Sequence, residues 1–242
     1  MSPAPLSICI RNAGHFLAFV LLLSVASIGA SRCAAADFAL TCPNPGICIL
    51  QIQGQINEGD RQKLGSLLAA KSKIIYLNVS LESEGGNYLE AIDLGRALRR
   101  LRAIVGVYEG SRCYSACVML LAGGVARIAI GEVGIHRPYP GDTSSQSYEQ
   151  AQRDFRQLEM VTRAYLRDMN LPEDLFNAMA TVPPHKLRIL SQSELRQYGL
   201  NVADPVDENI NNAKGAREYN LSIEEYLRRK AVIEQRCSGL QP

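Results

Sequence analysis

Short apolar runs rich in β-branched residues alternate with amphipathic stretches along most of the chain. The runs at 47–54, 73–80, 103–108, 126–130 and 133–136 predict strands. The stretches at 58–71, 88–101, 115–123 and 148–169 have the apolar spacing of helices. This alternation predicts an α/β fold, in which strand–helix–strand units place a parallel sheet between layers of helices.

Capping residues mark several helix starts. Asn87, Ser191 and Ser222 each precede a helical stretch and are followed three residues later by Glu, which is the spacing of a capping box. The last of these helices is expected to run to about Arg236, whereas residues 205–221 lack an apolar stripe and predict a linker. The helix over 88–101 is expected to bury the stripe of Leu89, Ile92, Leu98 and Leu101.

The N-terminus has the three parts of a secretory signal peptide. Arg11 supplies the positive charge, residues 16–30 form an uncharged apolar stretch, and small residues at 34–36 offer a cleavage site before Asp37. We therefore expect residues 1–36 to be a signal peptide and the protein to be periplasmic or secreted. The alternative is an uncleaved membrane anchor, although the apolar stretch is short for a membrane-spanning helix.

Composition and charge fit a folded protein that does not bind nucleic acid. Hydrophobic residues make up 47% of the chain and charged residues 21%. Arg11 and Arg32 are the only charged residues among the first 36, so the remainder carries 24 basic and 24 acidic residues. Because acidic and basic residues are balanced, the chain lacks the excess of basic residues that is typical of nucleic-acid-binding proteins.

Histidine is scarce, which narrows the search for a general base. The chain has three, and one lies in the predicted signal peptide, leaving His136 and His185. His136 ends a predicted strand, Ser115 opens a predicted helix, and Gly85-Gly86 follows another strand. Taken singly, these are an ordinary strand-end histidine, a helix cap and a turn. Together they can form a nucleophile, its base and a set of backbone N–H donors for an oxyanion.

The order strand, Gly-Gly, helix, strand, Ser, helix, strand, His resembles the Clp-protease proteolytic subunit, and in particular exported Clp-like proteins with a C-x-S-A-C segment. The resemblance covers residues 47–204 and is strongest at 74–138, from "IIYLNVSLESEGGNYLEAIDLGRALRR" to "SRCYSACVMLLAGGVARIAIGEVGIHRPY". It implies a Clp/crotonase-like spiral of ββα units over 37–204, followed by a C-terminal helical extension over 205–242. It also implies a homo-oligomer, since Clp-type subunits stack into rings.

The resemblance also implies roles for individual residues. Ser115 matches the nucleophile and His136 the general base. Gly85 and Gly86 match the glycine pair that supplies one oxyanion donor, and the N–H of Ala116 supplies the other. No cofactor is implied.

Three features depart from the family's pattern. Cys117 stands where glycine is usual, and the Ser115-to-His136 spacing of 21 residues is short. Leu187 aligns with the triad aspartate, and leucine cannot orient an imidazole. One alternative is another acid, for which Asp168, Asp174 and Asp204 are the candidates. The others are a Ser-His dyad and an inactive site. His185 lies close in sequence to Leu187 and can hydrogen-bond in place of the aspartate, but it is more simply interpreted as an ordinary loop histidine.

Five cysteines follow the predicted cleavage site, so at least one stays unpaired or pairs between chains. Cys42 and Cys48 flank a turn and can form a disulfide in an oxidising compartment. For Cys113 and Cys117 three alternatives are open: a disulfide that braces the serine turn, buried packing, or a zinc site with His136 and His185. The spacing lacks the paired histidines of common zinc sites, so no metal is expected.

Three functions remain compatible with these residues. The first is an exported serine hydrolase, a peptidase acting on short or unfolded polypeptides. The second is an inactive Clp-like oligomeric scaffold or peptide-binding protein, which Leu187 favours. The third is crotonase-type acyl-CoA chemistry, which export from the cytosol disfavours. Fold alone does not choose among them.

Overall fold

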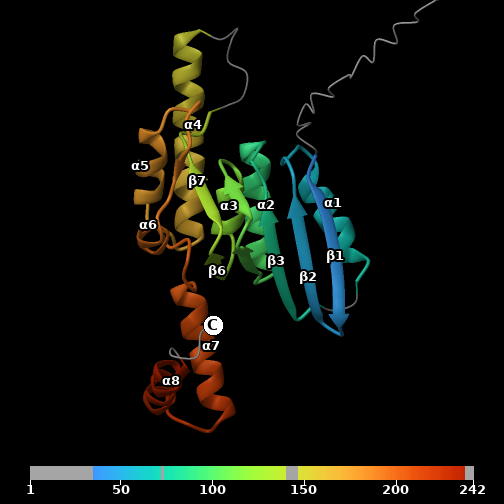
Figure 1. The fold of residues 1–242 in the computed structure, drawn as a ribbon, viewed down its shortest axis with the longest axis vertical. Helices are drawn as coiled ribbons and strands as arrows, with labels where there is room; N and C mark the ends of the chain where they lie inside the picture. The colour runs from blue at the N-terminus through green and yellow to red at the C-terminus, as the bar shows by residue number, and fades with distance from the viewer. Residues whose placement is uncertain (1–34, 72–73, 140–146, 238–242) are drawn as a thin grey trace, which may run out of the picture. The chain divides into compact units, whose positions relative to one another are not determined.

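The computed structural model describes residues 35–71, 74–139 and 147–237 (Figure 1). The predicted signal peptide over 1–36 lies outside these ranges except for its last two positions. No helix within the described ranges combines the length and the apolar character that a membrane span requires.

The strands and helices of the described ranges alternate over most of the chain. The strands are β1 (Asp37–Asn44), β2 (Ile47–Gln53), β3 (Tyr76–Glu82), β4 (Ile104–Val107), β5 (Arg112–Tyr114), β6 (Ala126–Ala129), β7 (Glu132–Ile135) and β8 (Arg188–Ile189). The helices are α1 (Asp60–Ala69), α2 (Tyr88–Arg100), α3 (Cys117–Ala122), α4 (Tyr148–Asp168), α5 (Asp174–Thr181), α6 (Gln192–Gln197), α7 (Pro205–Glu218) and α8 (Ile223–Cys237).

The larger sheet has the order β1-β2-β3-β4-β6, and its first three strands lie side by side in Figure 1. β1 pairs antiparallel with β2, and the remaining pairs are parallel. Side chains alternate along each strand, so that Leu50, Ile52, Val79 and Leu81 are fully buried on one face. The prediction of an α/β fold with a largely parallel sheet is confirmed.

The smaller sheet has the order β5-β7-β8 and carries the candidate site residues at its ends. β5 and β7 are parallel, and β8 is antiparallel to β7. A single bridge between Ser83 and Cys113 joins β5 to the end of β3. The sequence predicts no strand at β5, because three residues are too few for a recognisable alternation.

Two other predictions were wrong. Residues 205–218 form the helix α7 instead of a linker. Asp204 caps that helix by accepting hydrogen bonds from the N–H groups of Val206 and Asp207, each at 3.0 Å, and Pro205 occupies its first turn. Leu89 is 52% exposed, because the first turn of α2 stands at the rim of a cavity and not over the sheet.

A buried ion pair ties together the ends of several helices. The Arg127 guanidinium, 1% exposed, lies 3.7 Å from the Asp204 carboxylate. It donates to the carbonyl oxygens of Ala122, Met169 and Gly199 at 3.0, 2.7 and 3.1 Å, which satisfies the ends of α3, α4 and α6. Burial, with Arg99 close by, lowers the pKa of Arg127 to about 10.

Asp204 is the counter-charge of this cluster. Arg99 donates to it at 2.8 Å and Asn170 at 3.0 Å. Burial opposes ionisation of this carboxyl, but the hydrogen bonds from the Asp207 N–H, Arg99 and Asn170 outweigh burial and hold its pKa below the usual range.

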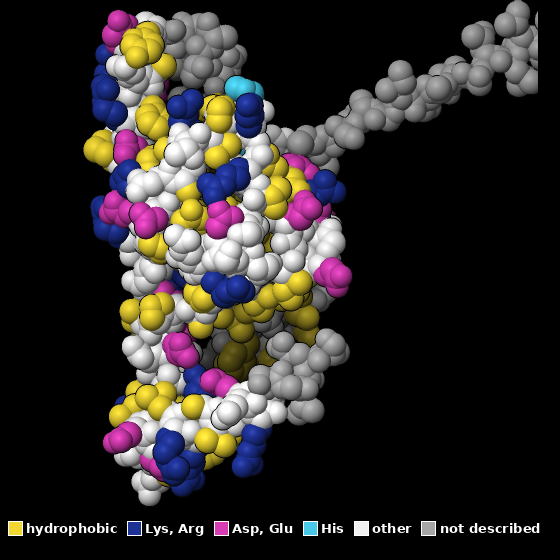
Figure 2. All heavy atoms as spheres, turned by 60° about the vertical axis from the view of Figure 1, so that its left-hand side comes forward, with side chains coloured by type: hydrophobic (Ala, Val, Ile, Leu, Met, Phe, Trp, Pro, Cys, Tyr) yellow, Lys and Arg dark blue, Asp and Glu magenta, His cyan; other side chains and the backbone are white. Residues whose placement is uncertain are grey.

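The face of the molecule in Figure 2 carries basic and acidic side chains interspersed with hydrophobic ones. Neither sign of charge gathers there into one continuous patch. This distribution matches the near balance of acidic and basic residues after position 36.

We predict that Asp204→Asn lowers the free energy of unfolding by about 3–5 kcal/mol, because it leaves Arg127 buried without a counter-charge. The Asp204 contribution should be complete above the ordinary carboxyl pKa of 3.8 and lost as pH falls through the lower native value. Urea denaturation at pH 7 and at pH 3 measures both effects. Asp168→Asn is the matched control: its pair with Arg96 is exposed and should contribute less than about 1 kcal/mol. Equal losses in the two variants would contradict the prediction.

Candidate active site

Ser115 lies on a tight turn between β5 and α3. Its φ is +56°, a left-handed conformation that is uncommon outside glycine and indicates local strain. The Ser115 N–H donates to the carbonyl oxygen of Gly134 on β7 at 2.9 Å. Tyr114 pairs with Gly134 in the parallel register, and His136 directly follows β7. Ser115 and His136 therefore stand at the carboxyl ends of two neighbouring parallel strands.

The backbone of Gly85 is in close contact with this turn. Gly85 has a φ of +100°. A Cβ there would lie 2.8 Å from the Ser115 Cβ, 2.8 Å from the Tyr114 carbonyl oxygen and 3.0 Å from the Ala116 nitrogen. No side chain fits between these two backbones, so glycine is required at position 85 by both space and conformation.

The orientation of the Gly85–Gly86 peptide leaves one N–H group facing away from the larger sheet. The Gly85 carbonyl oxygen accepts from the Ile56 N–H at 2.8 Å, and the Gly85 N–H donates to Ser83 Oγ at 3.1 Å. In a trans peptide the C=O and the following N–H point in opposite directions. The Gly86 N–H is therefore turned away from Ile56.

Two N–H groups beside Ser115 are free to donate. Among the residues that the structure describes, the N–H groups of Gly86 and Ala116 have no hydrogen-bond partner. The Gly85 N–H is already engaged by Ser83, so the role of Gly85 here is to permit the close approach. Free backbone donors next to a serine hydroxyl are what an oxyanion hole consists of.

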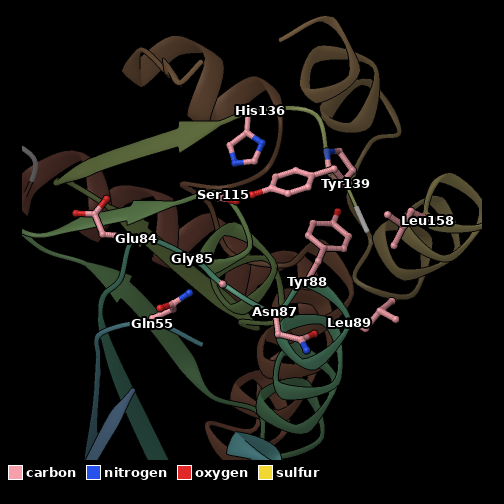
Figure 3. A pocket seen from close by; sticks show the side chains of 12 residues that line it. Gln55, Glu84, Gly85, Asn87, Tyr88, Leu89, Ser115, His136, Tyr139 and Leu158 are labelled. Atoms are coloured by element: carbon pink, nitrogen blue, oxygen red, sulfur yellow. The ribbon is translucent and has the colours of Figure 1, made fainter. Parts of the chain in front are cut away.

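A cavity of about 480 Å³ joins Ser115, His136, Gly85 and Gly86. Figure 3 shows His136 on one side of Ser115 and Gly85 on the other, with the Tyr139 ring extending toward the serine. The other lining residues are Gln55, Glu84, Asn87, Tyr88, Leu89, Pro138, Tyr139 and Leu158. Ser115 and His136 share this cavity without a hydrogen bond between them in the described chain. Such contacts often tighten only when substrate binds.

The imidazole of His136 is oriented by the backbone carbonyl of the next residue, Arg137. Its Nδ1 lies 3.0 Å from the carbonyl oxygen of Arg137. A carbonyl oxygen only accepts hydrogen bonds, so this contact requires the proton on Nδ1 and leaves the Nε2 lone pair available as a base. The Arg137 carbonyl thus selects the tautomer that a triad carboxylate would select.

Leu187 lies next to the end of the ladder that carries His136. β7 and β8 pair Gly134 with Ile189 and Ile135 with Arg188, and His136 and Leu187 are the next residues on the two segments. Leu187 is 43% exposed and packs over Gly134, where an added Cβ would lie 2.8 Å from the leucine Cδ1.

The other acids considered from the sequence are engaged elsewhere. Asp204 belongs to the arginine cluster, Asp168 lies 3.7 Å from Arg96, and Asp174 accepts from Asn177 at 3.3 Å. None of the three contacts His136 or lines its cavity. His185 is exposed and also does not line it.

Both disulfides that the sequence allows are present. Cys42 is bonded to Cys48, and Cys113 is bonded to Cys117 across the serine turn with a Cα separation of 5.2 Å. The second bridge removes the two thiolates that a zinc site at this turn would require. Cys237 is the free cysteine of the described ranges and is exposed on α8.

Sequence reasoning missed several cavity residues and the role of Ser83. Tyr139 is three residues beyond the predicted base, and Leu89 was assigned to the core. The signal for Ser83 was the spacing Ser-Glu-Gly-Gly, since a serine two residues before a tight glycine turn can accept from its N–H. The cavity residues come from separate elements, so only the folded chain brings them together.

Comparison with known proteins leaves the family open. No protein-family model and no curated protein sequence matches this chain. Among solved structures, the chain is similar to a mutant of the membrane-bound stomatin-specific protease 1510-N, with a TM-score of 0.49 and 16% identity. The match covers 68% of this chain and 81% of that one. A likeness at this level carries no argument about activity, so the function is argued from the site.

We predict that Gly85→Ala lowers the free energy of unfolding by about 3–5 kcal/mol, because left-handed strain and a clash with Ser115 add together. Gly110→Ala is the matched control: Gly110 has a φ of +79°, but nothing lies within 4 Å of its added Cβ. It should cost only the strain of about 1–2 kcal/mol. Urea denaturation of both variants tests the difference, and equal costs would show that the close approach is absent.

Proposed function

We propose that this protein is a serine hydrolase, and specifically a peptidase, with Ser115 as nucleophile and His136 as general base. The observation that carries the proposal is the position of Ser115. It sits on a strained turn in the same cavity as His136, beside two N–H groups without partners. Buried backbone N–H groups normally have hydrogen-bond partners. A turn that served only to begin a helix would therefore not be expected to leave two N–H groups unpartnered beside an imidazole.

The proposed mechanism uses only groups of this chain. Ser115 Oγ attacks the scissile carbonyl carbon while His136 Nε2 takes the hydroxyl proton. The N–H groups of Gly86 and Ala116 stabilise the oxyanion of the tetrahedral intermediate, an effect that contributes about 10²–10³ in rate for each donor. His136 then protonates the leaving amine, which departs and leaves an acyl group on Ser115. Water gives a proton to His136 Nε2 and attacks the acyl carbon, and His136 returns that proton to Ser115 Oγ as the bond to the acyl group breaks.

The resemblance to the Clp-protease subunit supports these assignments, since it selects Ser115, His136, Gly86 and Ala116 by position in the sequence. We extend the proposal to a spiral of ββα units over residues 37–204 with a helical extension. We also propose export to the periplasm or the cell exterior, which two disulfides favour. Assembly into a homo-oligomer and action on short or unfolded polypeptides complete the proposal.

One observation favours an inactive relative as a second candidate. Leu187, beside the end of the ladder that carries His136, aligns with the triad aspartate of the family it resembles, and loss of the acid in a serine-protease triad costs about 10⁴ in turnover. On this alternative the cavity binds a polypeptide without cleaving it. The two candidates differ in one measurable property, the reactivity of the Ser115 hydroxyl.

We predict that the chain starting at Asp37 forms one adduct with a fluorophosphonate, because His136 activates Ser115. Intact-mass spectrometry should show no adduct on Ser115→Ala and labelling at least a hundredfold slower on His136→Ala. Circular dichroism of each variant controls for folding. Absence of an adduct on the folded wild-type protein would reject the hydrolase and leave the binding protein.

We predict that Leu187→Asp raises the rate of labelling at Ser115 at least tenfold, because a carboxylate at the end of the β7–β8 ladder, next to His136, would stabilise the imidazolium. Leu187→Asn is the control of similar shape without the charge and should change the rate by less than threefold. A rate that falls in both variants would mean that Leu187 is needed for packing on Gly134 and that position 187 cannot complete a triad.

A further inference from the structure

A second cavity of about 440 Å³ adjoins the cavity of Ser115. Pro138 and Tyr139 line both, so the Tyr139 ring forms the wall between them. The outer walls come from the first turns of α4, which contribute Tyr148, Phe155 and Arg156, and from Arg137 after β7. A polypeptide that passes Ser115 and continues over Tyr139 reaches this second cavity next.

The aromatic walls of the second cavity are held in place. Gln152 Nε2 donates to the Tyr148 hydroxyl at 2.7 Å, which orients that ring. Phe155 packs against Phe176, with ring centroids 6.4 Å apart. The Arg137 guanidinium lies over the Phe155 ring at 5.9 Å, so its charge is positioned at the cavity wall.

The charged residues that line the second cavity in the described part of the chain are Arg137 and Arg156. Neither has a carboxylate partner there. Of the nearby acids of α4, Glu159 is paired with Arg163 at 2.9 Å, whereas Asp154 accepts from the neutral Gln150 at 2.7 Å and, like Glu149, forms no ion pair with either arginine. Guanidinium groups that stand free beside aromatic rings fit a carboxylate carried on an apolar body.

We propose that this second cavity is a subsite that binds a carboxylate of the substrate polypeptide, either an acidic side chain or the C-terminus. The inference rests on the proposed function for placing a polypeptide in the Ser115 cavity. Arg137 and Arg156 hold the carboxylate, and Tyr139, Tyr148 and Phe155 contact the apolar part of the bound residue. Because the arginines are exposed, their effect is on selectivity and is weakened by salt.

The test measures peptide binding to Ser115→Ala protein, which removes cleavage from the readout. The probes are fluorescein-labelled, C-terminally amidated decapeptides of Gly, Ser, Leu and Gln, with Glu in place of one Gln at each position in turn. A further pair compares a free C-terminus with the amide. Fluorescence anisotropy in 50 mM salt should show that at least one carboxylate peptide binds about three- to fivefold more tightly than its neutral partner.

This preference should vanish in Arg156→Gln and reverse in Arg156→Glu, where the neutral peptide should bind more tightly than its carboxylate partner. Arg153→Gln is the matched control, since Arg153 lies on the same helix, bonds to Gln150 and does not line the cavity; it should keep the preference. No difference between any pair, or a preference that survives loss of both Arg137 and Arg156, would overturn the subsite. A preference without a fluorophosphonate adduct on wild-type protein would reject the hydrolase but keep the subsite.

Discussion

The parallel pairing of β5 with β7 is the interaction on which the candidate site depends. β5 has three residues, yet its register with β7 and the hydrogen bond from the Ser115 N–H to Gly134 decide where the serine stands relative to His136. The Tyr114 hydroxyl donates to the Glu132 carboxylate across the pair, and that hydrogen bond raises the pKa of Tyr114 to about 12. The tyrosine therefore stays a neutral donor between the two strands.

The serine turn is strained, and several neighbours oppose its relaxation. Gly85 leaves no room for the turn to move toward β3, and Ser83 holds the Gly85 N–H from the same strand end. The Cys113–Cys117 bridge closes the turn covalently, which in a chain-entropy model stabilises the native state by about 2 kcal/mol. Together, these contacts and the disulfide hold Ser115 in a left-handed conformation that a non-glycine residue rarely adopts. They also fix the free N–H groups of Gly86 and Ala116 in place before substrate binds.

The site and the stabilising centre of the domain are separate. Arg127 and Asp204 join the ends of α3, α4 and α6 to the start of α7 by buried and partly buried polar contacts. The cavity of Ser115 instead has an exposed rim, with Leu89 and Tyr139 about half accessible. This arrangement lets the rim accept a polypeptide while the packing behind α3 holds the catalytic turn in place.

The sequence by itself determined the α/β class, most helices and four of the residues that line the cavity, namely Ser115, His136, Gly85 and Gly86, because periodicity, capping and turn chemistry are local properties. It could not predict α7, whose polar sequence is stabilised by the Asp204 cap and by an ion pair between Arg102 and Asp207 at 2.7 Å. Tertiary structure alone decided that Gly86 and not Gly85 has the free N–H, because Ile56 on a distant segment turns the peptide. It also decided that Leu187 packs over Gly134 beside the end of β7 and that Leu89 lines a cavity, since strand pairing and cavity walls join residues far apart in the chain.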